Sequence, residues 1–223
     1  MNRPLIISPS IMCCKFWEIK EYIRVFEECG IKLIHFDVMD GHFVDNIMLG
    51  TSFYKQLKEM TNIPLDIHFM CEEPERFLDY FHPAEGDWVS FHPETCSQPY
   101  RMLQRLRERG VKAGLALLPG IQAALLEEYK SVLEYVLVMT VNPGFAGQPM
   151  VPDAPEKIAR VRQILDNSGM AADVFADGNT TPDNAKKMRA AGANGFVVGT
   201  SSLLSSLEGF PEKYRDYVKV LIQ

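Results

Sequence analysis

The sequence predicts an α/β protein built as a single (β/α)8 barrel, the TIM-barrel class of fold. Short apolar runs rich in β-branched residues alternate with amphipathic stretches along all 223 residues. Eight such runs can be counted, and nothing between them resembles a linker, a low-complexity tract or a second domain. We therefore expect residues 1–223 to form one barrel domain, with an active site at the carboxyl ends of its strands.

The predicted strands are short apolar runs separated by helical patterns. They cover residues 5–12, 33–39, 65–70, 88–94, 112–119, 135–141, 173–178 and 195–201. Helical patterns lie between them, for example over residues 16–30, 99–110, 155–169 and 182–192, and several end on glycine, as helices commonly do. A doubly wound open sheet is the main alternative. It would normally carry a glycine-rich turn after its first strand, and Ser8-Pro9-Ser10 is not such a turn.

Composition and charge exclude several classes of protein. The net charge of −6 argues against a nucleic-acid partner, which requires a basic surface that releases counterions. The five cysteines are odd in number and lack CxxC spacing, which predicts reduced cytoplasmic thiols and neither a disulfide framework nor a structural zinc cluster. The first residues do not follow a signal-peptide pattern, and no apolar run approaches the roughly 20 residues that span a bilayer. We expect a soluble cytoplasmic protein that binds no membrane.

Two neighbouring predicted strands carry the same polar pattern on one face. Because side chains alternate along a strand, His35 and Asp37 share a face, and so do Asp66 and His68. A single buried histidine is about as often a hydrogen-bonded core residue as a metal ligand. The repetition on two strands favours a divalent metal ion that several of these side chains share. Asp177, at the end of the seventh predicted strand, is the fourth candidate ligand, although an Asp-Gly pair alone signals only a turn.

Three glycine-bearing loops follow the last three predicted strands. They are residues 142–148, Asp177-Gly178-Asn179 and Gly199-Thr200-Ser201. Glycine lets backbone N–H groups approach an anion, and the loops after strands seven and eight are the usual phosphate site of this fold. Each loop taken singly is more often a plain turn, but their convergence at one rim predicts a phosphate-binding site.

Several long motifs occur in the order and spacing of a known family. They are Ser8-Pro9-Ser10, 35-HFDVMDGHFV-44, His68-Phe69-Met70, 141-VNPGFAGQ-148 and Asp177-Gly178. Over nearly the whole chain they resemble the ribulose-phosphate 3-epimerase family, whose fold is the ribulose-phosphate-binding type of barrel. Within that family, 92-HPET-95 and 139-MTVNPGFAGQP-149 look more like the D-allulose-6-phosphate 3-epimerase branch, because the ribulose branch usually has glycine where Ala146 stands.

The resemblance implies a metal-dependent ketose-phosphate 3-epimerase that forms a homo-oligomer, either a dimer or a hexamer. It favours D-allulose 6-phosphate and D-fructose 6-phosphate as the interconverted pair, with D-ribulose 5-phosphate and D-xylulose 5-phosphate as the alternative. It implies one divalent ion per chain, bound by His35, Asp37, His68 and Asp177, and zinc, iron, cobalt and manganese all suit such ligands. Substrate contacts are expected from Ser10, Met39, His68, Met70 and Met139. Phosphate contacts are expected from Gly144, Phe145, Ala146, Gly147, Gly178, Asn179, Gly199, Thr200 and Ser201.

The predicted reaction requires two acid/base groups. Inversion of a carbinol carbon beside a ketone removes its proton, stabilises an enediolate and returns a proton from the opposite face. Asp37 and Asp177 arise from strands two and seven, so they can flank a substrate across the barrel mouth. A bound metal ion would act as a Lewis acid on the substrate oxygens. The methionines, which donate no proton, would cover the enediolate and exclude water, with core filling as their alternative role.

Two other functions are less consistent with the sequence. Decarboxylases of similar barrels carry an Asp-x-Lys-x-x-Asp motif, and no lysine follows Asp37. A non-catalytic sugar-phosphate-binding barrel would lack one acid/base group, and both are present.

Asp45, Leu118 and Phe175 stand where the family usually has proline, asparagine and glutamate, and the last two are expected near strand ends, where they bear on substrate fit. The remaining histidines, His42, His82 and His92, are predicted to be surface or hydrogen-bonding residues.

Overall fold

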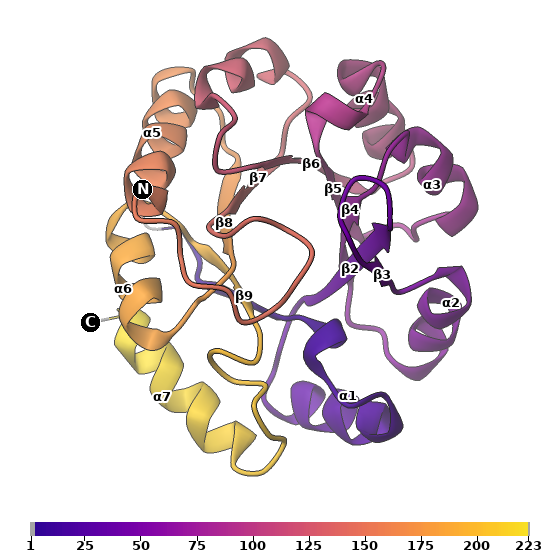
Figure 1. The fold of residues 1–223 in the computed structure, drawn as a ribbon, viewed down its shortest axis with the longest axis vertical. Helices are drawn as coiled ribbons and strands as arrows, with labels where there is room; N and C mark the ends of the chain where they lie inside the picture. Colours follow the sequence, from indigo (N-terminus) through magenta and orange to yellow (C-terminus); the bar gives the residue numbers. More distant parts are fainter. Residues whose placement is uncertain (1–2, 223) are drawn as a thin grey trace.

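Eight parallel strands surround a common axis in the computed structural model of the chain, which describes residues 3–222 (Figure 1). They are β1 (Ile6–Pro9), β2 (Ile34–Asp40), β4 (Leu65–Met70), β5 (Trp88–Phe91), β6 (Lys112–Leu117), β7 (Tyr135–Met139), β8 (Asp173–Asp177) and β9 (Gly195–Val198). Pairing runs from β1 to β9 and on through β8 to β2, and a parallel bridge between Ser10 and His35 joins β1 to β2. That bridge closes the sheet. The predicted (β/α)8 barrel is confirmed, and the open doubly wound sheet is excluded.

Helices cover the outside of the barrel (Figure 1). They are α1 (Ile19–Glu28), α2 (Thr51–Met60), α3 (Pro74–Phe81), α4 (Pro99–Glu108), α5 (Ala154–Asn167), α6 (Pro182–Ala190) and α7 (Phe210–Ile222), and the 3-10 turn η4 (Ala123–Tyr129) stands between β6 and β7. The patterns at 99–110, 155–169 and 182–192 correspond to α4, α5 and α6, whereas 16–30 divides into η2 (Phe16–Glu18) and α1. Within residues 3–222, no helix has the length and apolar character needed to cross a bilayer.

Most of the predicted strands extend too far at their carboxyl ends. β5 ends at Phe91 because Pro93, which has no backbone N–H, begins the 3-10 turn η3 (Pro93–Thr95). β9 ends at Val198, after which the Gly199 carbonyl accepts backbone N–H bonds from a turn and no longer pairs with a strand. The apolar pattern therefore outlasts the sheet by a few residues. The chain leaves the sheet in the very segments that form the barrel mouth.

A short strand that the sequence did not predict adds an edge to this mouth. β3 (Ile47–Met48) pairs antiparallel with the end of β2, with Met48 opposite Met39. Asp40 supports the connecting loop, since its carboxylate accepts the backbone N–H of His42 at 2.9 Å. A two-residue strand is too short to produce a period-2 pattern, which is why alternation in the sequence could not reveal it.

An aromatic layer fills the barrel interior below the mouth. The rings of Trp88, Tyr135 and Phe175 pack edge to face, with centroids 5.0 to 5.7 Å apart. Two strand glycines make room for them, since a Cβ atom on Gly114 would lie 2.2 Å from the Tyr135 ring and one on Gly195 would lie 2.3 Å from Phe175. Phe175 is therefore a fully buried part of the barrel floor. The expectation that it lies at the substrate site is corrected.

Candidate active site and metal centre

Four side chains with metal-binding chemistry meet at the carboxyl ends of the strands. His35 and Asp37 lie on β2, His68 on β4 and Asp177 at the end of β8, and one potential ligand atom from each lies within 4.8 Å of the others. His35 Nε2 is 3.1 Å from Asp37 Oδ1 and 3.8 Å from Asp177 Oδ2. His68 Nδ1 is 3.5 Å and 3.8 Å from the same two oxygens. The structure thus brings together all four residues that the sequence singled out as metal ligands.

The donor set fits a divalent cation. His68 Nδ1 is buried yet makes no hydrogen bond within residues 3–222, so the protein leaves this lone pair or proton for another partner. The other nitrogen of each imidazole is already engaged: His35 Nδ1 lies 2.7 Å from Asp66 Oδ2, and His68 Nε2 lies 3.0 Å from His92 Nε2. Both rings therefore turn their remaining nitrogen toward the two carboxylates. Two imidazoles and two carboxylates suit zinc, iron, cobalt or manganese.

The two carboxyl groups of the cluster differ in their affinity for protons. Burial raises the pKa of Asp177 to about 6; the neighbouring Asp37 adds to this rise, and His35 opposes it. Burial also favours the protonated form of Asp37, but attraction to His35 and its hydrogen bond outweigh burial and hold the pKa of Asp37 well below its ordinary value. For His35 itself, burial lowers the pKa, and the two carboxylates Asp37 and Asp66 overcome this effect and raise it.

Ser10 and His92 hold two of the four candidate ligands in place. The Ser10 hydroxyl, just beyond β1, donates to Asp37 Oδ2 at 2.6 Å, and so leaves Asp37 Oδ1 facing the histidines. His92 is fully buried beside His68, and burial together with that neighbour holds the pKa of His92 well below its ordinary value. A neutral His92 ring can accept the N–H of His68. Of the two predicted roles for His92, surface residue or hydrogen-bonding residue, the structure shows the second.

Two further residues of this site received no role from the sequence. The strand pattern indicates only that Asp66 shares a face with His68, and it places Tyr135 at the start of a predicted strand. The Tyr135 hydroxyl donates to Asp66 Oδ1 at 2.8 Å, while Asp66 Oδ2 contacts His35. Both side chains are fully buried directly beneath the cluster. A polar hydroxyl on the inward face of an otherwise apolar strand is the signal that would have identified Tyr135.

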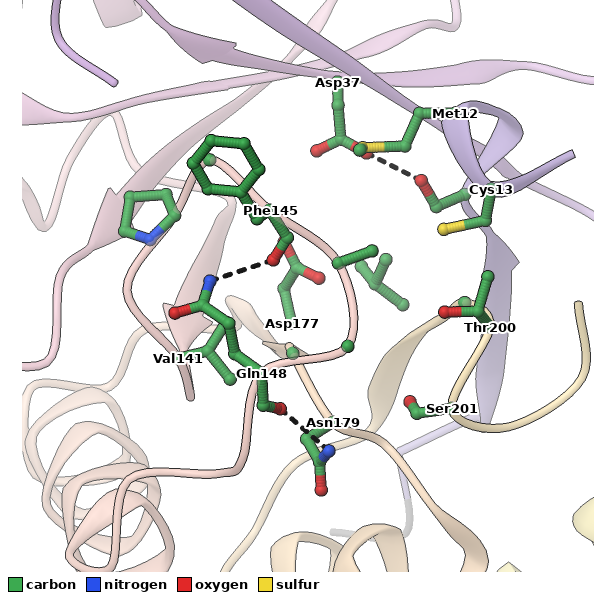
Figure 2. Close-up of a pocket in the computed structure, with 18 of the residues that line it drawn as sticks. Met12, Cys13, Asp37, Val141, Phe145, Gln148, Asp177, Asn179, Thr200 and Ser201 are labelled. Carbon is green, nitrogen blue, oxygen red and sulfur yellow. Dashed lines mark hydrogen bonds between the residues drawn. The ribbon is translucent and has the colours of Figure 1, made fainter. Parts of the chain in front are cut away.

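A pocket opens above the cluster, with Asp37 and Asp177 at its floor (Figure 2). It encloses about 560 Å³ of empty space, part of it open to solvent. Its walls include Met39, Met70 and Met139, each at most 4% exposed, as well as Ser10. The three methionines predicted to face the substrate therefore do line this pocket. His35 and His68 lie deeper, beneath the two carboxylates.

The three glycine-bearing loops also line the pocket. The residues predicted to contact phosphate all line it, namely Gly144, Phe145, Ala146, Gly147, Gly178, Asn179, Gly199, Thr200 and Ser201. Figure 2 shows how two of these loops are tied together: the Asn179 side-chain amide donates to the Gln148 carbonyl at 2.8 Å. Gly178 has a φ of 113°, and a Cβ atom there would lie 2.5 Å from Val141. Glycine is therefore required where the chain turns away from Asp177.

The other two unusual positions lie away from the pocket. Asp45 is exposed in the loop between β2 and β3. Leu118 packs against the apolar residues of the barrel interior, and its carbonyl accepts a hydrogen bond from the buried Lys157 ammonium. Lys157 also donates to the Ile121 carbonyl at 2.7 Å. These contacts fix the loop after β6, and neither Asp45 nor Leu118 is among the residues that line the pocket.

Comparisons with known proteins identify the family of the chain. A profile described as the ribulose-phosphate 3 epimerase family matches residues 6–203. The ribulose-phosphate 3-epimerase of Synechocystis sp. is 37% identical over 203 residues, covering 90% of this chain and 88% of the relative. That of Bacillus subtilis is 38% identical over 196 residues, covering 87% and 90%. That of Escherichia coli K12 is 34% identical over 200 residues, covering 89% of each.

Similar solved structures support the fold alone. A mutant tryptophan synthase α-subunit from Pyrococcus furiosus superposes with a TM-score of 0.69 at 14% identity, covering 100% of this chain and 99% of that one. Thiamine phosphate pyrophosphorylase from the same organism gives a TM-score of 0.62 at 15% identity, covering 100% and 98%. At such identities the chemistry of these enzymes carries no weight for this chain.

Proposed function

The chain belongs to the ribulose-phosphate 3-epimerase family, and from this premise we propose that it interconverts D-ribulose 5-phosphate and D-xylulose 5-phosphate. As a member of that family it is an isomerase of the epimerase class. One observation carries the proposal: Asp37 and Asp177 line the same pocket as three glycine-bearing loops. Acid/base groups at the floor and backbone N–H groups at the rim suit a small ketose with a phosphate at one end.

Asp37 and Asp177 divide the proton transfer at carbon 3 between them. The two strands that carry them are separated by β1 and β9 around the barrel, so the carboxyl groups approach a bound substrate from different directions. Both carboxyl groups line the pocket, so each can reach a bound substrate. One aspartate takes the proton from one face of carbon 3, and the other delivers a proton to the opposite face. This arrangement inverts the carbon.

The four clustered residues hold one divalent ion, which supplies Lewis-acid chemistry to the ketone and hydroxyl oxygens when it is bound. His35 and His68 provide imidazole nitrogens for it, and Asp37 and Asp177 provide carboxylate oxygens. Met39, Met70 and Met139 cover the reacting carbons with polarizable surface that neither donates a proton nor admits water. The loops at Gly144, Gly178 and Gly199 bind the phosphate.

D-allulose 6-phosphate is a second candidate substrate, and a specific observation favours it. The Thr140, Ala146 and Pro149 positions, together with 92-HPET-95, resemble the hexulose branch. Thr140 is fully buried, and its hydroxyl donates to the Asp177 carbonyl at 2.8 Å, so this branch-like residue helps to set the loop that carries Asp177. The relatives described above are all named for ribulose phosphate, and for that reason the pentulose comes first.

One experiment tests both the reaction and its substrate. The values of kcat/KM for D-ribulose 5-phosphate and D-allulose 6-phosphate are measured with identical metal loading, and solvent deuterium incorporation at carbon 3 is followed by NMR. We expect exchange at carbon 3 with both and a higher value for the pentulose. One carbon more or less in a pocket changes the transition-state binding energy by only about 1–3 kcal/mol, so we expect a modest ratio between the two kcat/KM values. A higher value for the hexulose overturns the substrate assignment, and binding without exchange overturns the epimerase mechanism.

A further inference from the structure

A buried chain of hydrogen bonds runs from the barrel floor to the metal cluster. The Tyr135 hydroxyl donates to Asp66 Oδ1 at 2.8 Å, and Asp66 Oδ2 lies 2.7 Å from His35 Nδ1. The other nitrogen of His35, Nε2, lies 3.1 Å from Asp37 Oδ1 in the cluster. Tyr135, Asp66 and His35 all have no exposed surface, so bulk solvent does not reach these contacts.

This chain determines which nitrogen His35 presents to the cluster. An imidazole binds a metal through an unprotonated nitrogen, and the hydrogen bond of its other nitrogen selects the tautomer. With Asp66 accepting from Nδ1, the ring carries its proton there and leaves Nε2 for the cluster. The orientation of the ring is then only as well defined as that of the Asp66 carboxylate.

Tyr135 is the residue that fixes the orientation of the Asp66 carboxylate. Within residues 3–222, Asp66 has two side-chain partners, and its oxygens are shared between them, one for His35 and one for Tyr135. Burial and the nearby Asp66 raise the pKa of Tyr135 well above its ordinary value, so the hydroxyl keeps its proton and donates. Loss of this donor would leave a buried carboxylate oxygen unpaired and the group free to rotate about its χ2 bond.

Tyr135 itself is held rigidly. Its ring packs edge to face on Trp88 at 5.0 Å and on Phe175 at 5.7 Å, and it lies so close to Gly114 that a Cβ atom there would be 2.2 Å away. Phe175 is thus part of the support for the Tyr135 hydroxyl. The aromatic layer is thus connected to the metal cluster through the hydrogen bonds of Tyr135, Asp66 and His35.

We propose that Tyr135 is a positioning residue that sets the metal affinity of the site by orienting Asp66 and, through it, the His35 imidazole. The inference rests on the proposed function only in that the cluster binds a divalent metal. Tyr135 touches neither the pocket nor a metal ligand directly. Its effect is therefore expected in metal binding, with substrate affinity unchanged once the site is loaded.

The fold offers a matched control for this proposal. The Tyr54 hydroxyl donates to Asp87 Oδ2 at 2.8 Å, the same length as the bond from Tyr135 to Asp66, and Asp87 is also fully buried. Neither residue lines the pocket or contacts the cluster. Tyr54→Phe and Tyr135→Phe therefore each remove a tyrosine–aspartate bond of the same length, one remote from the proposed metal site and one beneath it.

The test is a titration of metal-stripped full-length protein with Co²⁺, followed by the visible absorption of the bound ion. Tyr135→Phe is expected to raise the Kd for Co²⁺ by about 10–100-fold, the usual effect of losing an outer partner of a metal ligand. Tyr54→Phe is expected to match the wild type in Kd and spectrum. Equal Kd values for the wild type and both variants would overturn the proposal.

A double-mutant cycle guards against an indirect effect or a folding defect. Asp66→Asn also weakens Co²⁺ binding, and if Tyr135 acts through Asp66, adding Tyr135→Phe in that background causes little further loss. Fully additive losses overturn the proposed route. Should Tyr135→Phe not fold by circular dichroism, Asp66→Asn alone decides: an unchanged Co²⁺ affinity rejects the inference. Absence of turnover in a wild type that binds Co²⁺ refutes the proposed function and leaves this inference standing.

Discussion

Two buried carboxylate centres in this barrel are built on opposite principles. Asp87, just before β5, is fully buried and accepts from Tyr54 at 2.8 Å, Lys58 at 2.9 Å and the Leu65 backbone N–H at 2.9 Å. A fourth donor, the Ala84 N–H, lies 3.1 Å from it. Every oxygen of Asp87 thus has protein donors, one of them a cation.

The mouth centre lacks such compensation. Asp37 receives one hydroxyl from Ser10 and shares His35 with a second carboxylate, Asp177, which approaches the two histidines no closer than 3.8 Å. His68 Nδ1 has no hydrogen-bond partner within residues 3–222. Burying charge without full pairing costs stability, so a fold keeps such a group where a ligand completes it. The contrast separates a carboxylate that holds the scaffold together from a pair that serves chemistry.

The comparison is tested most severely by removing one carboxylate from the mouth. Asp177→Asn keeps the size of the side chain and removes its charge, and we expect kcat/KM for epimerisation to fall by about 10³-fold or more, since general acid/base catalysis alone contributes about 10²–10⁴-fold. Asp173→Asn, at the other end of β8 and paired with Lys112, is the control and should retain activity. Normal epimerisation by Asp177→Asn would mean that a single base suffices.

Removing the scaffold carboxylate should produce the converse result. Asp87→Ala leaves the Lys58 ammonium and two backbone N–H groups without their acceptor, and breaking a buried pair in this way costs about 3–5 kcal/mol of the free energy of unfolding. Urea unfolding measures that loss, and kcat/KM of the folded fraction should stay at the wild-type value. Lost activity with unchanged stability would show that Asp87 is not a purely structural centre.

Much of this division was predictable from residue order. Alternation along β2 and β4 placed His35 and Asp37 on one face and His68 on the matching face of the next strand, and parallel pairing then brought them together. Asp177 followed from its position at a strand end. Short periodic patterns report the face of a side chain and the edge of a sheet, and those two facts were sufficient for the cluster.

The partners beneath the cluster were beyond that reasoning. Tyr135 is 69 residues from Asp66, and nothing in either local pattern states that a hydroxyl on β7 reaches a carboxylate on β4 across the barrel. His92 lies within a strand predicted to run to residue 94, whereas β5 ends at Phe91 and the buried His92 side chain contacts His68 just before the turn η3. Phe175 shows the same limit, because its depth in the barrel depends on Gly195 of the neighbouring strand. Partner choice is tertiary information.

Metal removal should change the unfolding midpoint through the cluster at the barrel mouth and not through Asp87, and this effect is expected to be smaller than those of the two substitutions. A ligand that binds only the folded state stabilises it by about 2.7 kcal/mol when its free concentration is 100 times Kd, so chelation should lower the unfolding midpoint correspondingly. Calorimetric scans with and without a chelator measure this shift. Asp87→Ala should show the same metal-dependent shift as the wild type, whereas His68→Ala should show none. A wild-type midpoint that is indifferent to saturating metal would contradict a metal centre at the mouth.

The smallest expected effect concerns Cys13, which lines the pocket beside the mouth centre. Burial raises its pKa from the ordinary value of 9.0 to about 11, with Asp37 and Asp177 adding to the rise and the Thr200 backbone opposing it. Two pKa units cut the thiolate fraction at pH 8 by about 100-fold, while the higher basicity of the remaining thiolate recovers roughly a factor of ten, so alkylation should be about tenfold slower than for a free cysteine. Iodoacetamide labelling followed by mass spectrometry measures the rate at Cys13, with Cys13→Ser confirming the assignment. Labelling as fast as that of a free thiol would mean that burial and the two neighbouring carboxylates do not raise the pKa of Cys13.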